Sequence, residues 1–360
     1  MKFYDRIKIW LPNIEKYLID MEICEQDVEY HAEGNVLIHT LMVLDEVEKL
    51  DINKDDKEIL RWVALLHDIG KPYVSTIEDG KIRSHGHSKR SYHIAMELLE
   101  ETHLDKNTKL EILNLVKLHG KASWAYEKED VERYIMDLSM SCRLDLLYYF
   151  STCDFKGRIA DDIDVCLERI EIFKDVASEL GCFGNPYNFS SKIAKFNYLV
   201  KRTHHYLDNP YDDTKSKVFM VCGLPGVGKD TYINKSLSWL PVISLDDIRK
   251  ELGIKPTDEQ GKVIQTAKER ARVHMRKGED FVWNATNVTK RLRSSIISFF
   301  VEYNSYIDMT FLHKPLEQVL EQNKNRDESV PVPVIMKLYN KLEIPTYKES
   351  HELNIILQDN

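Results

Sequence analysis

The stretch Gly223-Leu-Pro-Gly-Val-Gly-Lys-Asp-Thr231 decides the fold of the second half of the chain. It follows residues 218–222, a short apolar run that is typical of a buried parallel strand, and it precedes sequence with helical character. Its three glycines allow the backbone to curl so that N–H groups point at phosphate oxygens. The N-terminus of the following helix adds a favourable dipole. Strand, glycine-rich loop and helix in this order predict a P-loop.

The sequence on either side of this loop predicts two domains. Apolar runs at residues 242–245, 281–283 and 307–312 alternate with helical segments, which predicts a parallel sheet with crossover connections. Roughly the first 200 residues have apolar positions every three or four residues, which predicts an all-α domain. We therefore expect a helical domain at residues 1–204, a polar linker at residues 205–216 and an α/β domain at residues 217–360.

The loop predicts a site for ATP, or another nucleoside triphosphate, together with Mg²⁺. Lys229 is expected to reach the β- and γ-phosphates. Asp230 stands where a Ser or Thr usually follows the lysine, and Thr231 comes next. Because adenylate kinases have a similar shift, we expect Thr231 to contact Mg²⁺. The predicted nucleotide-binding residues are Gly223, Pro225, Gly226, Val227, Gly228, Lys229, Asp230 and Thr231.

Charged residues after the next strand favour phosphoryl transfer over simple hydrolysis. A carboxylate at the end of a parallel strand lies near the phosphates, so Asp246 could accept a proton from an acceptor hydroxyl. Arg249 lies three residues further on and could hold an acceptor phosphate. Arg326 is expected near a helix, where it could close over the nucleotide. A helix-capping Asp246 beside a solvated Arg249 is the alternative interpretation.

The second informative stretch is Ala64-Leu-Leu-His-Asp-Ile-Gly-Lys-Pro72. Adjacent His67 and Asp68 on a helix project about 100° apart, so both can converge on one ion. Imidazole and carboxylate ligands suit Mn²⁺, Ni²⁺, Co²⁺ or Zn²⁺. Histidines or aspartates that could join them are His39, His87, His119 and Asp154. For the other histidines, a structural or surface role is the ordinary expectation.

The first half resembles the HD phosphohydrolase superfamily over residues 35–158. The resemblance rests on His39 in Asn-Val-Leu-Ile-His-Thr, on the His67-Asp68 pair and on Asp154 in Thr-Cys-Asp. It implies a metal-activated water that attacks a phosphoester, and a first metal set of His39, His67, Asp68 and Asp154. The order His87 then His119 resembles members that hold two metals. Lys71 and Arg158 either bind substrate phosphate or are solvated charges.

The second half resembles the polynucleotide 5′-kinase family over residues 217–353. The matching sequences are GLPGVGKDT, Asp246-x-x-Arg249, Asn284-Ala-Thr-Asn287 and Asn323-Lys-Asn-Arg326. The resemblance implies that Asp246 is the base for the 5′-OH, that Arg249 contacts the acceptor 3′ phosphate and that Arg326 contacts the donor phosphates. Together the two halves resemble bacterial HD–polynucleotide kinase end-healing enzymes.

This resemblance implies RNA or DNA strand ends as substrates. The HD domain would remove a 2′,3′-cyclic phosphate or a 2′/3′ monophosphate, the kinase domain would phosphorylate a 5′-OH, and a separate ligase would seal the products. The main alternative is a nucleotide or small-metabolite kinase joined to an HD nucleotide hydrolase. A P-loop ATPase that acts as a nucleic-acid-binding switch is a third possibility, against which Asp246 and Arg249 argue.

Composition excludes several other classes of protein. The net charge of −9 argues against a protein that coats long nucleic acid by bulk electrostatics. No apolar run approaches the roughly 20 residues that span a bilayer, and charges interrupt the N-terminal segment, so we expect a cytoplasmic protein with no membrane contact. The six cysteines form no CxxC pair, which argues against a zinc cage.

Overall fold

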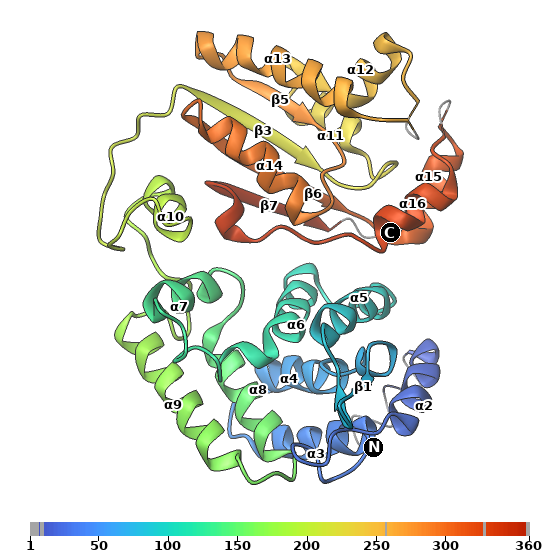
Figure 1. Cartoon of the computed structure of the whole chain (residues 1–360), viewed down its shortest axis with the longest axis vertical. Coiled ribbons are helices and arrows are strands. Elements are labelled where there is room, and N and C mark those ends of the chain that lie inside the picture. The colour runs from blue at the N-terminus through green and yellow to red at the C-terminus, as the bar shows by residue number, and fades with distance from the viewer. Residues whose placement is uncertain (1–6, 8–10, 256–257, 327–328, 358–360) are drawn as a thin grey trace. The chain divides into compact units, whose positions relative to one another are not determined.

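The chain forms two compact units in a computed structural model that describes residues 7, 11–255, 258–326 and 329–357. Contacts divide it into Met1–Asn188 and Phe189–Asn360 (Figure 1). In the described part of the chain, no helix is both long and apolar enough to cross a bilayer.

The first unit is helical, as the periodicity predicts. Helix α3 packs against α4 and α8, and α4 also packs against α6. Asparagine caps begin α3 and α4: Asn35 Oδ1 accepts from Ile38 N at 3.0 Å and Asn53 Oδ1 accepts from Asp56 N at 2.9 Å. The elements are η1 (Pro12–Ile14), α2 (Glu15–Ile23), α3 (Val36–Lys49), α4 (Lys54–Leu66), η2 (Lys71–Tyr73), β1 (Thr76–Glu78), β2 (Lys81–Arg83), α5 (His87–Glu100), α6 (Lys106–Leu118), η3 (His119–Lys121), α7 (Val131–Ser139), α8 (Leu144–Lys156) and α9 (Ile163–Glu179).

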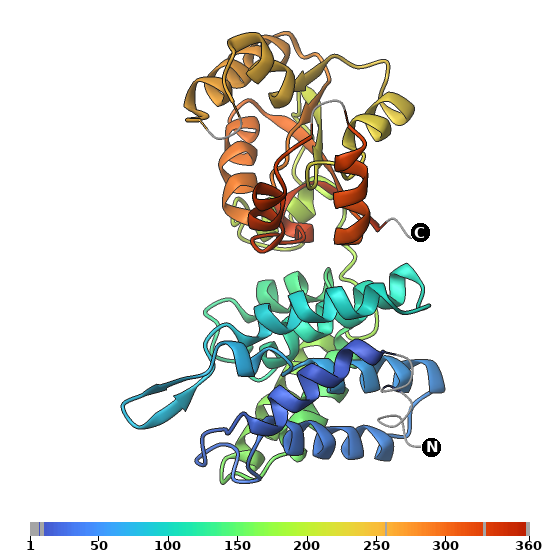
Figure 2. The same cartoon turned by 90° about the vertical axis from the view of Figure 1, so that its right-hand side faces the viewer.

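A small antiparallel hairpin, β1–β2, interrupts the helices and was not predicted from the sequence. It projects from the helical body, as the short blue arrows of Figure 2 show. Asp79 and Gly80 at its turn both have positive φ, at 50° and 75°, as a tight hairpin turn requires. β1 is exposed throughout and β2 is exposed at Lys81 only, and strands of three residues are too short for an alternating apolar pattern to mark them.

The second unit is a five-stranded parallel sheet in the order β4-β5-β3-β6-β7, with helices on both faces (Figures 1 and 2). All four predicted strands are present. The elements are α10 (Lys192–Leu199), β3 (Ser216–Cys222), α11 (Lys229–Ser236), β4 (Val242–Ser244), α12 (Leu245–Leu252), α13 (Gly261–Lys277), β5 (Phe281–Asn284), α14 (Lys290–Val301), β6 (Ser305–His313), α15 (Leu316–Lys324), α16 (Val332–Tyr339), η4 (Tyr347–Glu349) and β7 (Glu352–Leu357).

The contact-based boundary falls after Asn188, earlier than the predicted domain end at residue 204. Helix α10 therefore belongs to the α/β unit. Lys195 Nζ donates to the backbone oxygen of His351 at 2.8 Å, and the ring of Phe196 stacks on the ring of His351 at 4.1 Å between centroids. These contacts join α10 to the start of β7, and no local sequence pattern reports them.

Candidate active sites in the two units

Six side chains from five helical segments meet at the centre of the first unit. His39 lies within α3 and Asp154 within α8, whereas His67 is the C-cap of α4 and Asp68 lies in the turn after it. His87 and His119 begin α5 and η3. The ligand atoms form two groups, each within 4.8 Å: His39 with His67 and Asp154, and Asp68 with His87 and His119.

The four histidines are held in one orientation. Each Nδ1 lies near a backbone oxygen, at 3.1 Å from Gly157 for His39, 2.8 Å from Ala64 for His67, 2.9 Å from Ser84 for His87 and 2.7 Å from Val116 for His119. Because a carbonyl oxygen can only accept, each Nδ1 carries a proton, and each ring offers a lone pair at Nε2 when it is neutral. Nε2 atoms lie 3.3 Å apart in His39–His67 and 3.2 Å apart in His87–His119. Converging lone pairs of this kind fit bound cations.

Asp68 joins the two groups. Its Oδ2 lies 3.3 Å from His67 Nε2, and its Oδ1 lies 3.4 Å from His87 Nε2. Asp68 is 2% exposed, and Oδ1 has no hydrogen-bond partner among the described residues. Burial acts to raise the pKa of Asp68, but Lys71 and His67 hold that pKa well below its ordinary value. A buried, ionised and unpartnered oxygen fits a divalent cation, and a shared carboxylate fits a pair of them.

The histidines differ in charge. Burial lowers the pKa of His39, but hydrogen bonds to Asp154 and Glu33 outweigh it and raise this pKa to about 9. Burial, together with the charges of His87 and His67, lowers the pKa of His119 to about 4. With no cation bound, His39 therefore favours a second proton on Nε2, 3.0 Å from Asp154 Oδ1, and a metal ion would have to displace that proton. His119 stays neutral, as a metal ligand must be.

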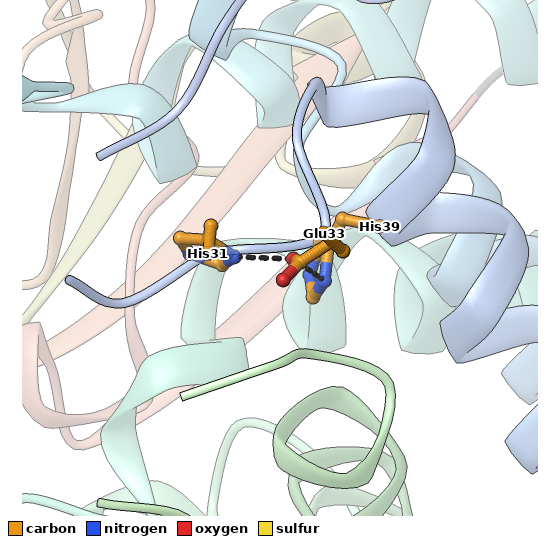
Figure 3. Close-up of side chains that lie close together, drawn as sticks. All are labelled: His31, Glu33 and His39. Atoms are coloured by element: carbon orange, nitrogen blue, oxygen red, sulfur yellow. Dashed lines mark hydrogen bonds and ion pairs between the residues drawn. The ribbon is translucent and has the colours of Figure 1, made fainter. Parts of the chain in front are cut away.

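The carboxylate of Glu33, which the sequence analysis did not identify, contacts the Nδ1 side of the His39 ring. Figure 3 shows Glu33 between the rings of His31 and His39. Glu33 Oε1 accepts from His31 Nδ1 at 2.8 Å and lies 3.2 Å from His39 Nδ1, while Ile159 N donates to Oε2 at 2.8 Å. Of the four histidines, His39 alone has a carboxylate of a described residue within 4.0 Å of Nδ1, in addition to its backbone oxygen. A negative partner makes an imidazole a stronger ligand.

Replacing Glu33 with Gln is expected to weaken divalent metal binding by about 10–100-fold, the usual effect of losing such a supporting partner. Calorimetric titration of the metal-free protein with Co²⁺ measures the affinity for the metal. The matched control is Glu29→Gln, which removes a surface ion pair with Lys81 on the hairpin. Equal affinities for the two variants would contradict this role for Glu33.

Gly70 shows why the His-Asp motif needs a glycine two residues later. A Cβ at this position would lie 2.4 Å from Ser91 N and 2.8 Å from the backbone oxygen of His87. Gly70 N also donates to Ser91 Oγ at 2.9 Å. The turn that carries Asp68 therefore touches the backbone of α5, and this contact places His87 opposite Asp68.

We expect Gly70→Ala to lower the free energy of unfolding by about 1–3 kcal/mol, because the added methyl group forces α5 away from the turn. Urea denaturation followed by circular dichroism measures the loss. Gly184→Ala serves as the control, since a Cβ there meets nothing within 4 Å, and about 0.5 kcal/mol or less is expected for it. A Gly70→Ala protein as stable as the control would refute the close approach.

Lys71 and Arg158, the two candidates for binding substrate phosphate, already have carboxylate partners. Lys71 Nζ lies 2.6 Å from Asp68 Oδ2 and donates to Gln26 Oε1 at 2.6 Å. Arg158 Nη2 donates to Asp162 Oδ1 at 2.6 Å. Lys71 thus contacts a candidate metal ligand directly, whereas Arg158 forms an ion pair with Asp162, the residue before α9.

In the second unit, the P-loop lies between β3 and α11 as predicted. Gly223, Gly226 and Gly228 all have positive φ, at 146°, 83° and 97°. A Cβ at Gly223 would lie 2.5 Å from the backbone oxygen of Leu312. Lys229 is 8% exposed, and its Nζ donates to the backbone oxygens of Gly223 at 3.0 Å and Leu224 at 2.8 Å. Burial lowers the pKa of Lys229 to about 8, although Asp230 opposes this.

A cavity of about 180 Å³ opens beside the loop. This volume is below the roughly 300–1,000 Å³ of pockets that enclose whole drug-sized ligands, and suits phosphate groups. Its lining residues are Gly226, Gly228, Lys229, Asp230, Thr231, Asp246, Gln322 and Arg326. Five of the predicted nucleotide-binding residues therefore line one cavity, while Gly223, Pro225 and Val227 are buried within the loop.

Asp246 and Arg249 lie beside this cavity. Ser244, not Asp246, caps α12, because Ser244 Oγ accepts from Asp247 N at 3.2 Å. The capping interpretation of Asp246 is therefore wrong. The side chain of Asp246 is 59% exposed and pairs with Arg249, whose Nε also donates to Gln260 Oε1 at 2.8 Å.

Arg326 follows the end of α15. The Asn323 side chain donates to the Val330 backbone oxygen and accepts from Val330 N, both at 2.8 Å, which ties Val330 to the last turn of α15. Arg326 Nη2 lies 3.9 Å from Asp230 Oδ2. The three charged residues predicted for phosphoryl transfer, Asp246, Arg249 and Arg326, thus lie in or directly beside the P-loop cavity.

Comparisons with known protein families also divide the chain into two parts. Residues 36–146 match the HD domain family and residues 218–345 match a family described as an AAA domain. The HD match thus lies in the helical unit, and the AAA match lies in the α/β unit that carries the P-loop.

Solved structures similar to part of the chain include a sugar kinase from a Janibacter species (17% identity, TM-score 0.31) and a gluconokinase from Sinorhizobium meliloti (16% identity, TM-score 0.31). Each match covers 40% of this chain, and 85% and 83% of those chains respectively.

Proposed function

We propose that this protein heals RNA or DNA ends. Its HD domain would hydrolyse a 2′,3′-cyclic phosphate and the resulting 2′/3′ monophosphate, and its P-loop domain would transfer the γ-phosphate of ATP or another NTP to a 5′-OH. The observation that carries the proposal is that Asp246, an exposed carboxylate paired with Arg249, lines the same cavity as Lys229. A base that is open to solvent can receive a hydroxyl at the end of a long chain.

In the HD domain, the six converging residues would hold one or two divalent cations such as Mn²⁺, Ni²⁺, Co²⁺ or Zn²⁺. Such cations polarise phosphate oxygens and lower the pKa of a nucleophilic water. Asp154 and His87 are 19% and 26% exposed in their side chains, whereas His39, His67 and His119 are 6% exposed or less. The phosphoester would therefore approach the cations from the side of Asp154 and His87. The buried ligands would exclude water from the opposite side.

In the P-loop domain, the acceptor oxygen forms a bond with the γ-phosphorus as the bond to the β-γ bridging oxygen breaks. Asp246 accepts the hydroxyl proton, and the nucleoside diphosphate leaves. Lys229 would exchange its contacts with loop carbonyls for phosphate oxygens. Arg249 would exchange Asp246 for an acceptor phosphate, which frees the carboxylate to act as a base. Arg326 neutralises charge on the transferred group.

One RNA tests both activities. An oligonucleotide with a 5′-OH and a 2′,3′-cyclic phosphate is incubated with ATP and Mg²⁺, with and without Mn²⁺, Ni²⁺ or Co²⁺, and both ends are resolved. The proposal expects a 5′-phosphate and a 3′-OH. Nucleosides and small sugars are offered as competing acceptors. Phosphorylation of these acceptors, with both RNA ends unchanged, would instead assign the chain as a metabolite kinase joined to a nucleotide hydrolase.

A further inference from the structure

We propose that Asp230, and not the hydroxyl of Thr231, is the side-chain ligand of the Mg²⁺ that accompanies the bound nucleotide. The assignment rests on the proposed kinase function and deepens it. It also departs from the expectation that Thr231 contacts Mg²⁺.

The position of Asp230 is the first argument. It directly follows Lys229, where the hydroxyl that contacts Mg²⁺ usually stands in a P-loop. Both residues lie in the first turn of α11 and both line the phosphate cavity. The Asp230 side chain is 67% exposed, so it is accessible to an ion that arrives with a nucleotide.

The second argument is that Asp230 is held in place. Asn284, at the end of β5, donates from Nδ2 to Asp230 Oδ1 at 2.7 Å. Asn284 is 6% exposed, and its own Oδ1 is buried with no hydrogen-bond partner among the described residues. Because the Asn284 amide fixes one carboxylate oxygen of Asp230, the other oxygen, Oδ2, remains for a cation. Arg326 Nη2 lies 3.9 Å from this oxygen. The unpartnered Asn284 oxygen can accept from a water in the ion's hydration shell, which Mg²⁺ usually retains in part.

The third argument is electrostatic. A carboxylate beside the nucleotide phosphates repels their negative charge, and this repulsion is stronger near a protein surface than in bulk water. Asp230 therefore opposes nucleotide binding unless a cation lies between it and the phosphates. Mg²⁺ is typically bound by one or two carboxylates together with substrate phosphates. A neutral hydroxyl at this position would carry no such penalty, so Asp230 makes nucleotide binding depend on the metal.

The coupling between Mg²⁺ and ATP tests the assignment without measuring catalysis. ATP affinity is measured by calorimetry in EDTA and in Mg²⁺ for the full-length wild type, Asp230→Ala, Asp230→Ser and Thr231→Val. We expect Asp230→Ala to bind metal-free ATP several-fold more tightly than wild type and to lose about tenfold or more of the gain from Mg²⁺. Asp230→Ser should also bind metal-free ATP more tightly but keep part of the gain. Thr231→Val should keep the wild-type coupling.

The outcomes separate this inference from the proposed function. If Asp230→Ala and Asp230→Ser gain from Mg²⁺ as wild type does, while Thr231→Val does not, Thr231 is the ligand and the inference is overturned. If the wild type binds ATP neither with nor without Mg²⁺, the kinase function itself fails, and the assignment falls with it. Circular dichroism of each variant shows whether a weaker affinity comes from misfolding. Asp230→Ser introduces a side chain that is common at this position of P-loops, so we expect this variant to fold.

Discussion

The variant Asp68→Asn is expected to lose 3′-end hydrolysis by at least about 10³-fold, a loss equivalent to about 4 kcal/mol of transition-state stabilisation. The amide keeps the size of the carboxylate but removes its charge. Since Asp68 lies between both histidine groups, one substitution weakens every cation site of the HD domain. The same change removes the ionic partner of Lys71, whose buried ammonium group then opposes an incoming cation.

The measurement is the rate of 2′,3′-cyclic phosphate opening and phosphate release with saturating Mn²⁺ or Ni²⁺, together with metal content by mass spectrometry. The matched control is Asp55→Asn, an exposed aspartate in the first turn of α4, the helix that leads to Asp68. In both variants 5′ phosphorylation should continue at the wild-type rate. Retention of hydrolysis in Asp68→Asn would exclude the six-residue cluster as the hydrolytic site.

The second large effect is expected from Lys229→Met, which should reduce 5′ phosphorylation by about 10²–10³-fold or more. Methionine preserves the buried aliphatic stem, so the substitution removes mainly the ammonium group. That group is the buried cation of the phosphate cavity and is held against two loop carbonyls. Without it, the developing negative charge on the phosphates loses a preorganised donor.

Initial rates with radiolabelled ATP and a 5′-OH oligonucleotide measure this loss. Lys235→Met, on the exposed end of the same helix, is the control. Hydrolysis at the 3′ end should be unaffected in both variants, and a mixture of Asp68→Asn with Lys229→Met should complete both reactions on one RNA. Failure of the mixture, with each single variant folded, would show that the two sites do not act independently.

Much of the fold was predictable because its signals are local. The P-loop needs strand, glycines and helix in direct succession, and each is visible in a few residues. The difference between the predicted domain end at residue 204 and the contact-based division after Asn188 has the opposite cause. Helix α10 joins the α/β unit through Lys195, whose partner His351 is 156 positions away. Strand β7 was not predicted because most of its residues are only partly buried, which leaves no continuous apolar run. The strands of the hairpin are too short for an alternating apolar pattern to mark them.

The residues of the candidate sites also divide into those that a local motif reveals and those whose role depends on contacts between distant residues. Short motifs identified the six metal-site residues and the P-loop residues, and the structure brings each set together, although their roles stay predictions. Glu33 was missed because its function depends on the approach of His31, His39 and Ile159, and no motif encodes that meeting. Asn284 was recognised within Asn-Ala-Thr-Asn, but its hydrogen bond to Asp230 exists only because β5 pairs beside β3.

Helix α10 has a practical consequence for dividing this protein into fragments. An α/β fragment that starts at residue 205, the predicted linker, would lack the aromatic ring that covers one side of His351 and the ammonium group that caps its carbonyl. His351 directly precedes the edge strand β7, so such a fragment would expose the border of its sheet to self-association. A fragment that starts near Phe189 keeps this cover, and a helical fragment that ends at Asn188 loses none of its own helices.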